Sequence, residues 1–299
     1  MDHNRDFDPR YGEAVALSDG IRRITAPNSG AFTFHGTNTY LIGIDPIIVV
    51  DPGPDLDSHI ETILRATSGA EIAAIAVTHT HVDHSPAARR LKDLSHAPVI
   101  GCGPHRAARD LKLGEINPMD ASADRDYQPD VLMGDGDRFD AGGLTLEAIA
   151  TPGHTQNHLS FALLGTPYLL SGDHVMAWST SIVAPPDGNM RAYLSSLDKL
   201  MGRPEHHFLP GHGAAIADAR PYMADLRAHR LRRETAIMEQ LATGAKTIPE
   251  LVELIYLDLP DGLKGAAALS VFAQLEDLVD RGRVAASPEL LLNARYQLA

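Results

Sequence analysis

The segment from Thr78 to His84 reads THTHVDH and holds three histidines and one aspartate. Imidazole nitrogens and carboxylate oxygens are the ligands that zinc and related divalent metals accept in proteins. In an extended segment, residues two apart point to the same side, so we expect His79, His81 and Asp83 to converge and His84 to face elsewhere. Ser85 and Pro86 predict that a helix begins directly after these side chains.

Three more candidate ligands occur in a repeated setting. His154, Asp173 and His212 each come just after a β-prone run, and a glycine precedes each of them. A lone histidine is more often a surface or core residue than a ligand, so the prediction depends on the repetition and not on any one position. Loops that leave neighbouring strands at the same edge of a sheet commonly form sites. Five histidines and two aspartates would suffice for two metal ions.

The elements that must position these residues alternate between strands and helices. Helical patterns cover Asp57 to Thr67, Ala87 to Leu94 and Met190 to Met201, which predicts an α/β fold with helices over the sheets. The β-prone runs are Thr39 to Ile44, Ile47 to Val50, Ile72 to Val77, Pro98 to Ile100, Leu144 to Ala150, Leu159 to Leu164, Tyr168 to Leu170 and His207 to Leu209.

The character of the sequence changes near residue 215, so we predict a first domain at 1–215 and a second, mainly helical domain at 216–299. A helical pattern covers Arg220 to Thr243. Thr247 and Glu250 fit a capping box that opens a second helix, and a third runs from about Leu263 to Asp280. A short hairpin within Arg283 to Leu298 would complete the order of a winged-helix unit.

The whole pattern resembles the metallo-β-lactamase superfamily, whose His-x-His-x-Asp-His signature stands at residues 79 to 84, and the resemblance extends from about Gly36 to Gly213. It implies an αββα sandwich. It also implies that His79, His81 and His154 hold one metal, that Asp83, His84 and His212 hold the other, and that Asp173 bridges both. Asp51 matches an early aspartate of the family, which we interpret as support behind the ligands.

The resemblance implies two zinc ions, with iron or manganese as alternatives. Two such ions can lower the pKa of a shared water toward ~7 and so provide hydroxide for hydrolysis. Asp83 could orient this nucleophile. His158 could donate a proton to the leaving group, although a supporting role behind the ligands is equally compatible with the sequence. The bridging aspartate and the lack of a second cysteine argue against a true β-lactamase.

Two substrate classes remain open. We favour a small-molecule thioester or related ester, because residues 216 to 299 contain ten Lys or Arg against twelve Asp or Glu and lack aromatic residues placed for base stacking. The alternative is cleavage of single-stranded RNA, since the C-terminal segment resembles the tail of the lactamase-beta-like protein 2 group. Its basic cluster of Arg227, Arg230, Arg232 and Arg233 could then contact phosphates. A non-catalytic metal sensor is a third interpretation.

Composition narrows the setting of the protein. Of its 299 residues, 44% are hydrophobic and 22% are charged, as in folded globular proteins, and we find no apolar stretch of membrane-spanning length. Met1 to Gly20 lacks the apolar region of a signal peptide, so we expect a cytoplasmic location. The net charge of −13 disfavours non-specific nucleic-acid binding. Cys102 is expected to be a passive thiol, Trp178 could wall the substrate pocket, and a homodimer is left open.

Overall fold

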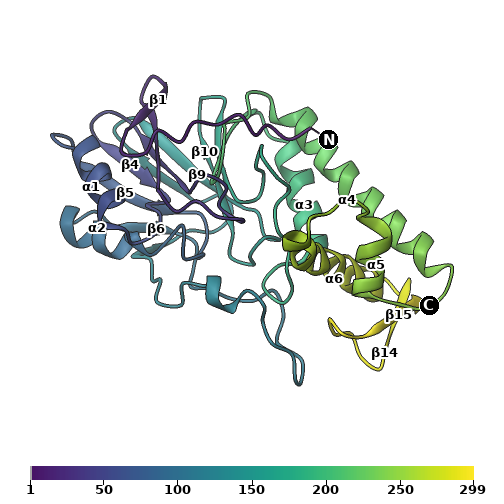
Figure 1. Ribbon diagram of the computed structural model, residues 1–299. Helices are drawn as coiled ribbons and strands as arrows, with labels where there is room; N and C mark the ends of the chain where they lie inside the picture. The colour runs from purple at the N-terminus through teal and green to yellow at the C-terminus, as the bar shows by residue number, and fades with distance from the viewer. Residues whose placement is uncertain (1) are drawn as a thin grey trace.

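The computed structural model describes residues 2–299 as two sheets that pack face to face, with helices outside them and a smaller domain at one end (Figure 1). The first sheet has seven strands that follow one another in chain order. They are β1 (Val15–Ser18), β2 (Ile21–Thr25), β3 (Asn38–Ile42), β4 (Ile47–Val50), β5 (Ile72–Val77), β6 (Val99–Gly101) and β7 (Val131–Leu132). Strands β1 to β4 pair antiparallel, and β4 to β7 pair parallel.

The second sheet has five strands in the order β12-β11-β10-β9-β8. They are β8 (Arg138–Ala141), β9 (Leu144–Ala150), β10 (Leu159–Leu163), β11 (Tyr168–Gly172) and β12 (His207–Pro210). Only β11 and β12 pair parallel, which places the loops that follow them at the same edge. That edge carries two of the predicted ligands, one in each loop.

Helices cover both outer faces, as the predicted αββα sandwich requires. The first sheet is covered by α1 (Asp57–Ala66) and α2 (Ala87–Ser95), and the second by α3 (Met190–Met201) and the start of α4 (Ala219–Leu241). Fully buried Leu41 and Ile75 of the first sheet share one core with Leu146 and Phe161 of the second. Burial of such side chains is the main stabilising contribution to the sandwich.

All eight predicted strand runs contain a strand, but β1, β2, β7 and β8 of these two sheets were not predicted. The predicted start of α2 was wrong in detail. Pro86 and not Ser85 occupies the N-cap position, and no side chain caps the helix. The Ser85 hydroxyl instead donates to Asp124 Oδ2 at 2.6 Å, so it ties the loop to a neighbouring segment.

The smaller domain has the predicted winged-helix order of three helices and a hairpin (Figure 1). Thr247 and Glu250 form the predicted capping box at the start of α5. A core around Phe272 and Tyr296 holds the domain together. Besides α4, its elements are β13 (Lys246–Thr247), α5 (Ile248–Ile255), the 3-10 turn η2 (Asp261–Leu263), α6 (Lys264–Asp280), β14 (Val284–Ser287) and β15 (Arg295–Leu298).

Helix α4 belongs to both parts of the molecule. Met223 and Leu226 near its start pack against the second sheet and α3, whereas Ile237 and Leu241 near its end pack in the smaller domain. A domain boundary at residue 215 therefore stays a prediction. Within residues 2–299 no helix has the length and apolar character needed to cross a membrane. The cytoplasmic location and the homodimer also stay predictions.

Candidate metal centre

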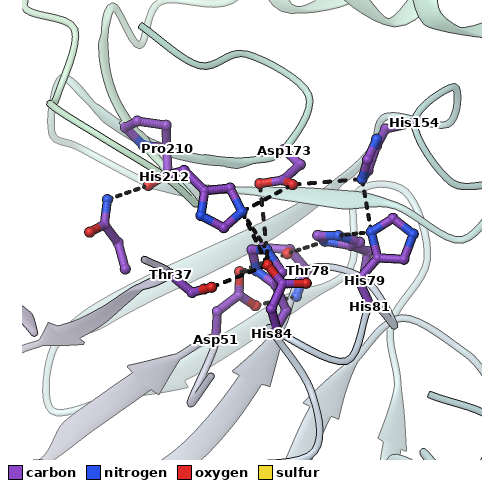
Figure 2. A network of polar contacts seen from close by, with 12 residues as sticks. Thr37, Asp51, Thr78, His79, His81, His84, His154, Asp173, Pro210 and His212 are labelled. Carbon is purple, nitrogen blue, oxygen red and sulfur yellow. Dashed lines mark hydrogen bonds and ion pairs between the residues drawn. The ribbon is translucent and has the colours of Figure 1, made fainter. Parts of the chain in front are cut away.

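The seven predicted ligands meet at one edge of the sandwich, where Figure 2 shows six of them pointing toward one another. His79, His81, His154 and Asp173 form a first group whose ligand atoms all lie within 4.8 Å of one another. His81 Nδ1 lies 3.1 Å from His79 Nε2 and 3.0 Å from His154 Nε2. Three ring nitrogens thus face a common point.

The second group contains Asp83, His84 and His212. Asp83 Oδ2 lies 3.4 Å from His84 Nε2 and 3.2 Å from His212 Nε2. Asp173 touches both groups, because one of its oxygens is 3.5 Å from His84 Nε2 and the other is 3.3 Å from His212 Nε2 and 3.7 Å from His154 Nε2. Its position between the groups is the one that a bridging ligand needs.

The prediction that His84 faces elsewhere was wrong. The chain is extended only through His79, Thr80 and His81, and Thr80 points away toward His105 and Asn157. Residues 82 to 84 form a turn, closed by a hydrogen bond from the His84 N–H to the His81 carbonyl at 2.9 Å. This turn returns His84 to the edge where Asp83 lies.

Hydrogen bonds on the far nitrogens fix four of the five imidazole rings. In each case Nδ1 is bonded away from the centre, so Nε2 is the nitrogen that faces inward and can bind a metal ion once it carries no hydrogen. Two of the four partners follow strands of the first sheet: Thr78 comes after β5 and Asp51 after β4. Asp51 lies behind a ligand, as predicted, and that ligand is His84. The partners are Thr78 Oγ1 for His79 (3.0 Å), Asp51 Oδ2 for His84 (2.9 Å), the Ile182 carbonyl for His154 (2.7 Å) and the Gly36 carbonyl for His212 (3.1 Å).

His81 is the fifth ring, and it presents Nδ1 to the centre. Its Nε2 has no hydrogen-bond partner among residues 2–299. Asp187 shares a small cavity with His81, and its buried Oδ2 likewise lacks one, although His105 Nε2 lies 3.5 Å away. Sequence reasoning missed Asp187 and His105, because neither stands in the signature. His105 follows β6, but no glycine directly precedes it.

The charges of the centre suit cation binding. Burial alone would raise the pKa of Asp173, but the nearby His212 and His84 outweigh it and hold the pKa well below its usual range. Burial, together with His154, lowers the pKa of His81 to about 3. Burial opposes protonation of His212, yet the carboxylates of Asp173 and Asp83 raise its pKa to about 10. Metal binding would therefore displace a proton from His212.

Two observations show that the donor set fits metal ions. Asp173 Oδ1 is buried without a hydrogen-bond donor in the described part of the chain, which is costly for a carboxylate unless a cation lies against it. Gly211 leaves the space open, since a Cβ there would lie 2.4 Å from Asp173 Oδ1 and 2.6 Å from His84 Cε1. Nitrogen and oxygen donors of this kind match zinc, iron or manganese.

His158 lies behind the ligands and is buried. The Asp173 backbone N–H donates to its Nε2 at 3.1 Å, so its hydrogen is on Nδ1 and is donated to Thr151 Oγ1 at 2.8 Å. Both ring nitrogens are thus occupied, and His158 does not line the cavity described below. These contacts favour the supporting role over proton donation to a leaving group.

A cavity of about 420 Å³ opens directly onto the centre. His81, Asp83 and His212 form its base, and Trp178 forms part of one wall, as the sequence suggested. The opposite wall comes from the smaller domain, which the sequence did not predict. It consists of Tyr256, Leu259, Leu263, Ala266, Ala267 and Ser270.

Comparison with protein families gives two matches that cover the two parts of the chain. Residues 32–212 match the metallo-beta-lactamase superfamily. Residues 247–289 match the beta-lactamase associated winged helix domain. The first match contains every predicted ligand, and the second begins at the capping threonine of α5.

Individual relatives match over nearly the whole chain. A beta-lactamase-like protein 2 homolog of Caenorhabditis elegans is 30% identical over 90% of this chain and 87% of its own length. An atrochrysone carboxyl ACP thioesterase of Aspergillus chevalieri is 29% identical over 89% of this chain and 82% of its own. Among solved structures, a beta-lactamase domain protein from Burkholderia ambifaria superposes with a TM-score of 0.80 at 20% identity, covering 99% of this chain and 96% of that one.

Proposed function

This chain belongs to the metallo-β-lactamase superfamily and is a metal-dependent hydrolase, and we propose that it uses two metal ions, zinc by preference, to hydrolyse small-molecule acyl thioesters. The observation that carries the proposal is the cavity of about 420 Å³ that reaches the metal ligands between two mainly apolar walls. A volume in this range suits a small organic ligand. The relative named as a thioesterase supports the same bond type.

The residues of the centre would have different roles. His79, His81 and His154 would hold one ion, Asp83, His84 and His212 the other, and Asp173 both. Bound there, the two ions would acidify a water molecule and polarise the thioester carbonyl. Asp83 is the most exposed of the acidic ligands, with 20% of its side chain accessible, and it borders the cavity. Its ionised carboxylate can accept a hydrogen bond from the attacking water.

The leaving group also favours a thioester. A thiol has a pKa near ~8.5, so a thiolate can depart with little help from a proton donor. A sugar hydroxyl, the leaving group in RNA cleavage, is far more basic and needs such help. His158 is turned away from the cavity by its two hydrogen bonds, and thioester hydrolysis does not require it.

In the RNA alternative four arginines would contact phosphates, but three of them already make contacts within the protein. Arg227 pairs with Asp198 at 2.7 Å. Buried Arg230 lines the cavity, but it donates to the Ser181 carbonyl. Arg233 donates to the Ile255 carbonyl and lies over the Tyr256 ring. Of the four arginines only Arg232 is exposed and makes no side-chain hydrogen bond or ion pair in the described structure, so the cluster offers little to a polyanion.

The test compares turnover of one zinc-loaded preparation on an acyl thioester and on single-stranded RNA of matched concentration. We expect thioester hydrolysis that disappears on chelation and returns with zinc. Faster RNA cleavage would favour the nuclease, and two bound metals without turnover of either substrate would favour the sensor. Elemental analysis of the protein as purified identifies the native metal.

A further inference from the structure

One wall of the cavity that contains the metal centre is supplied by the first half of α6 and the segment before it. Leu263, Ala266, Ala267 and Ser270 line the cavity. Ala266, Ala267 and Ser270 stand three, four and seven residues after Leu263, the N-cap, which is the spacing of one helix face. Three of the four have small side chains. The opposite wall brings Phe32, Met176 and Trp178, which are large. The space between the walls therefore exists because α6 is small at these positions.

The second half of α6 is fixed to the sandwich, which sets the width of this space. Arg109 from the long loop after β6 contacts Glu276 through Nε at 2.9 Å and also binds Glu115 with both terminal nitrogens at 2.6 Å. Arg191 of α3 donates to Asp277 at 2.7 Å. Ala273 packs into the core that contains α3. A wall held in this way can discriminate substrates by size.

One residue that lines the cavity also has a buried polar group without a protein partner. Trp178 lines it and is 7% exposed, and its indole Nε1–H has no acceptor within the described residues. The Trp178 ring is held by stacking on Phe34, with ring centroids 4.8 Å apart and planes 8° from parallel. Buried indole N–H groups normally find an acceptor. An oxygen atom of a substrate would satisfy this donor.

We infer that the α6 wall selects the acyl group of the substrate, and that this group is bulky and largely apolar. With the thioester carbonyl at the metal centre, the acyl group extends between Trp178 and the face of α6 formed by Ala266, Ala267 and Ser270. An acetyl group would leave that space unfilled. This inference rests on the proposed thioesterase function and adds to it the class of acyl group.

The test is the ratio of kcat/KM for a 2-naphthoyl thioester of N-acetylcysteamine to that for the acetyl thioester. We expect a ratio well above one for the wild type and a fall of at least tenfold in Ala266→Phe and in Ser270→Leu, because both fill the cavity. Gly265→Leu is the matched control, since a Cβ at this exposed position meets no atom within 4 Å and the residue does not line the cavity. It should leave the ratio unchanged.

A second measurement separates the inference from the proposed function. Trp178 is the sole tryptophan, so energy transfer from it to 2-naphthoate reports binding of the acyl part without turnover. Weaker naphthoate binding in both filled variants, with metal content and folding retained, supports the inference. If both variants fold and neither the kcat/KM ratio nor naphthoate binding changes, the inference is overturned. Absence of turnover of either thioester by the wild type overturns the proposed function instead, whatever naphthoate binding shows.

Discussion

The metal centre and the first half of α6 border the same cavity. The metal side consists of imidazoles and carboxylates that follow strands, and four of its five imidazoles are held by a hydrogen bond from behind. The α6 side consists of small and apolar side chains that make few polar contacts. If an imidazole on the metal side rotates, the metal ion loses a ligand. A larger side chain on the α6 side changes only the volume available to the substrate. In our proposal the first side therefore determines the reaction and the second side selects the substrate.

The largest effect is expected on the metal side, from Asp173→Ala or His81→Ala. Either change should remove at least one of two metal ions and lower kcat/KM by about a thousandfold, equivalent to roughly 4 kcal/mol of transition-state stabilisation. Metal analysis and thioester turnover measure this. Two ions and full activity in either variant would contradict the ligand assignment.

A smaller effect is expected from Asp51, which does not bind metal itself but holds the ligand His84. Asp51 accepts from His84 Nδ1 at 2.9 Å and from the Thr78 N–H and hydroxyl at 2.8 Å each. In Asp51→Asn one acceptor oxygen becomes a donor, so His84 loses its orientation. We expect metal affinity to fall by about 10-fold to 100-fold. Competition with a chromogenic chelator measures it, and unchanged affinity would show that His84 needs no such support.

Below this edge, buried His59 should make stability depend on pH. Burial lowers its pKa from 6.5 to about 4, and its Nε2 lies 2.8 Å from Thr39 Oγ1, whose hydroxyl donates to the Asp51 carbonyl. The folded-state pKa is the lower one, so the unfolded chain takes up the proton first. This stability is complete above pH 6.5 and is lost as the pH falls toward 4.

Between pH 7.5 and 4.5 the metal-free wild type should lose roughly 2 to 3 kcal/mol more than His59→Gln. Glutamine keeps a donor for Thr39 but does not titrate. Urea unfolding of both proteins at the two pH values gives the difference, in which the titration of the metal ligands cancels. Parallel losses in the two proteins would mean that His59 does not contribute.

On the α6 side, Arg109→Met tests whether the wall is fixed. It leaves Glu115 and Glu276, with side chains 5% and 9% exposed, without their cation. Because Arg109 itself is 25% exposed, solvent screens part of the interaction, and we expect a loss of about 1 to 2 kcal/mol. The preference for the naphthoyl thioester should fall while metal content stays at two. If the protein is destabilised but its preference for the naphthoyl thioester is unchanged, the Arg109 contacts stabilise the fold without contributing to substrate selection.

The two sides also differed in how far the sequence predicted them. His154, Asp173 and His212 each follow a strand and a glycine, and the signature at residues 79 to 84 holds the other four proposed ligands. Local pattern and resemblance were therefore sufficient to select seven residues that meet at one edge. The turn at residues 82 to 84 was missed because alternation along an extended chain was assumed beyond His81. The α6 wall left no local signal, since alanine and serine in a helix look the same whether they face a cavity or a neighbour. Its role depends on docking through Arg109 and Arg191, which are distant in sequence from Glu276 and Asp277.

The smallest effect is expected from Trp178→Phe. Phenylalanine keeps an aromatic ring beside Phe34 but removes the Nε1–H that lacks a protein acceptor. A neutral hydrogen bond contributes about 1 kcal/mol, so KM should rise roughly fivefold for an acyl group that bears an oxygen and stay unchanged for a hydrocarbon of the same shape. The 6-hydroxy-2-naphthoyl and 2-naphthoyl thioesters form this pair. Metal content should not change, because Trp178 belongs to neither ligand group. An equal rise in KM for both thioesters would assign Trp178 a purely apolar contact with the substrate.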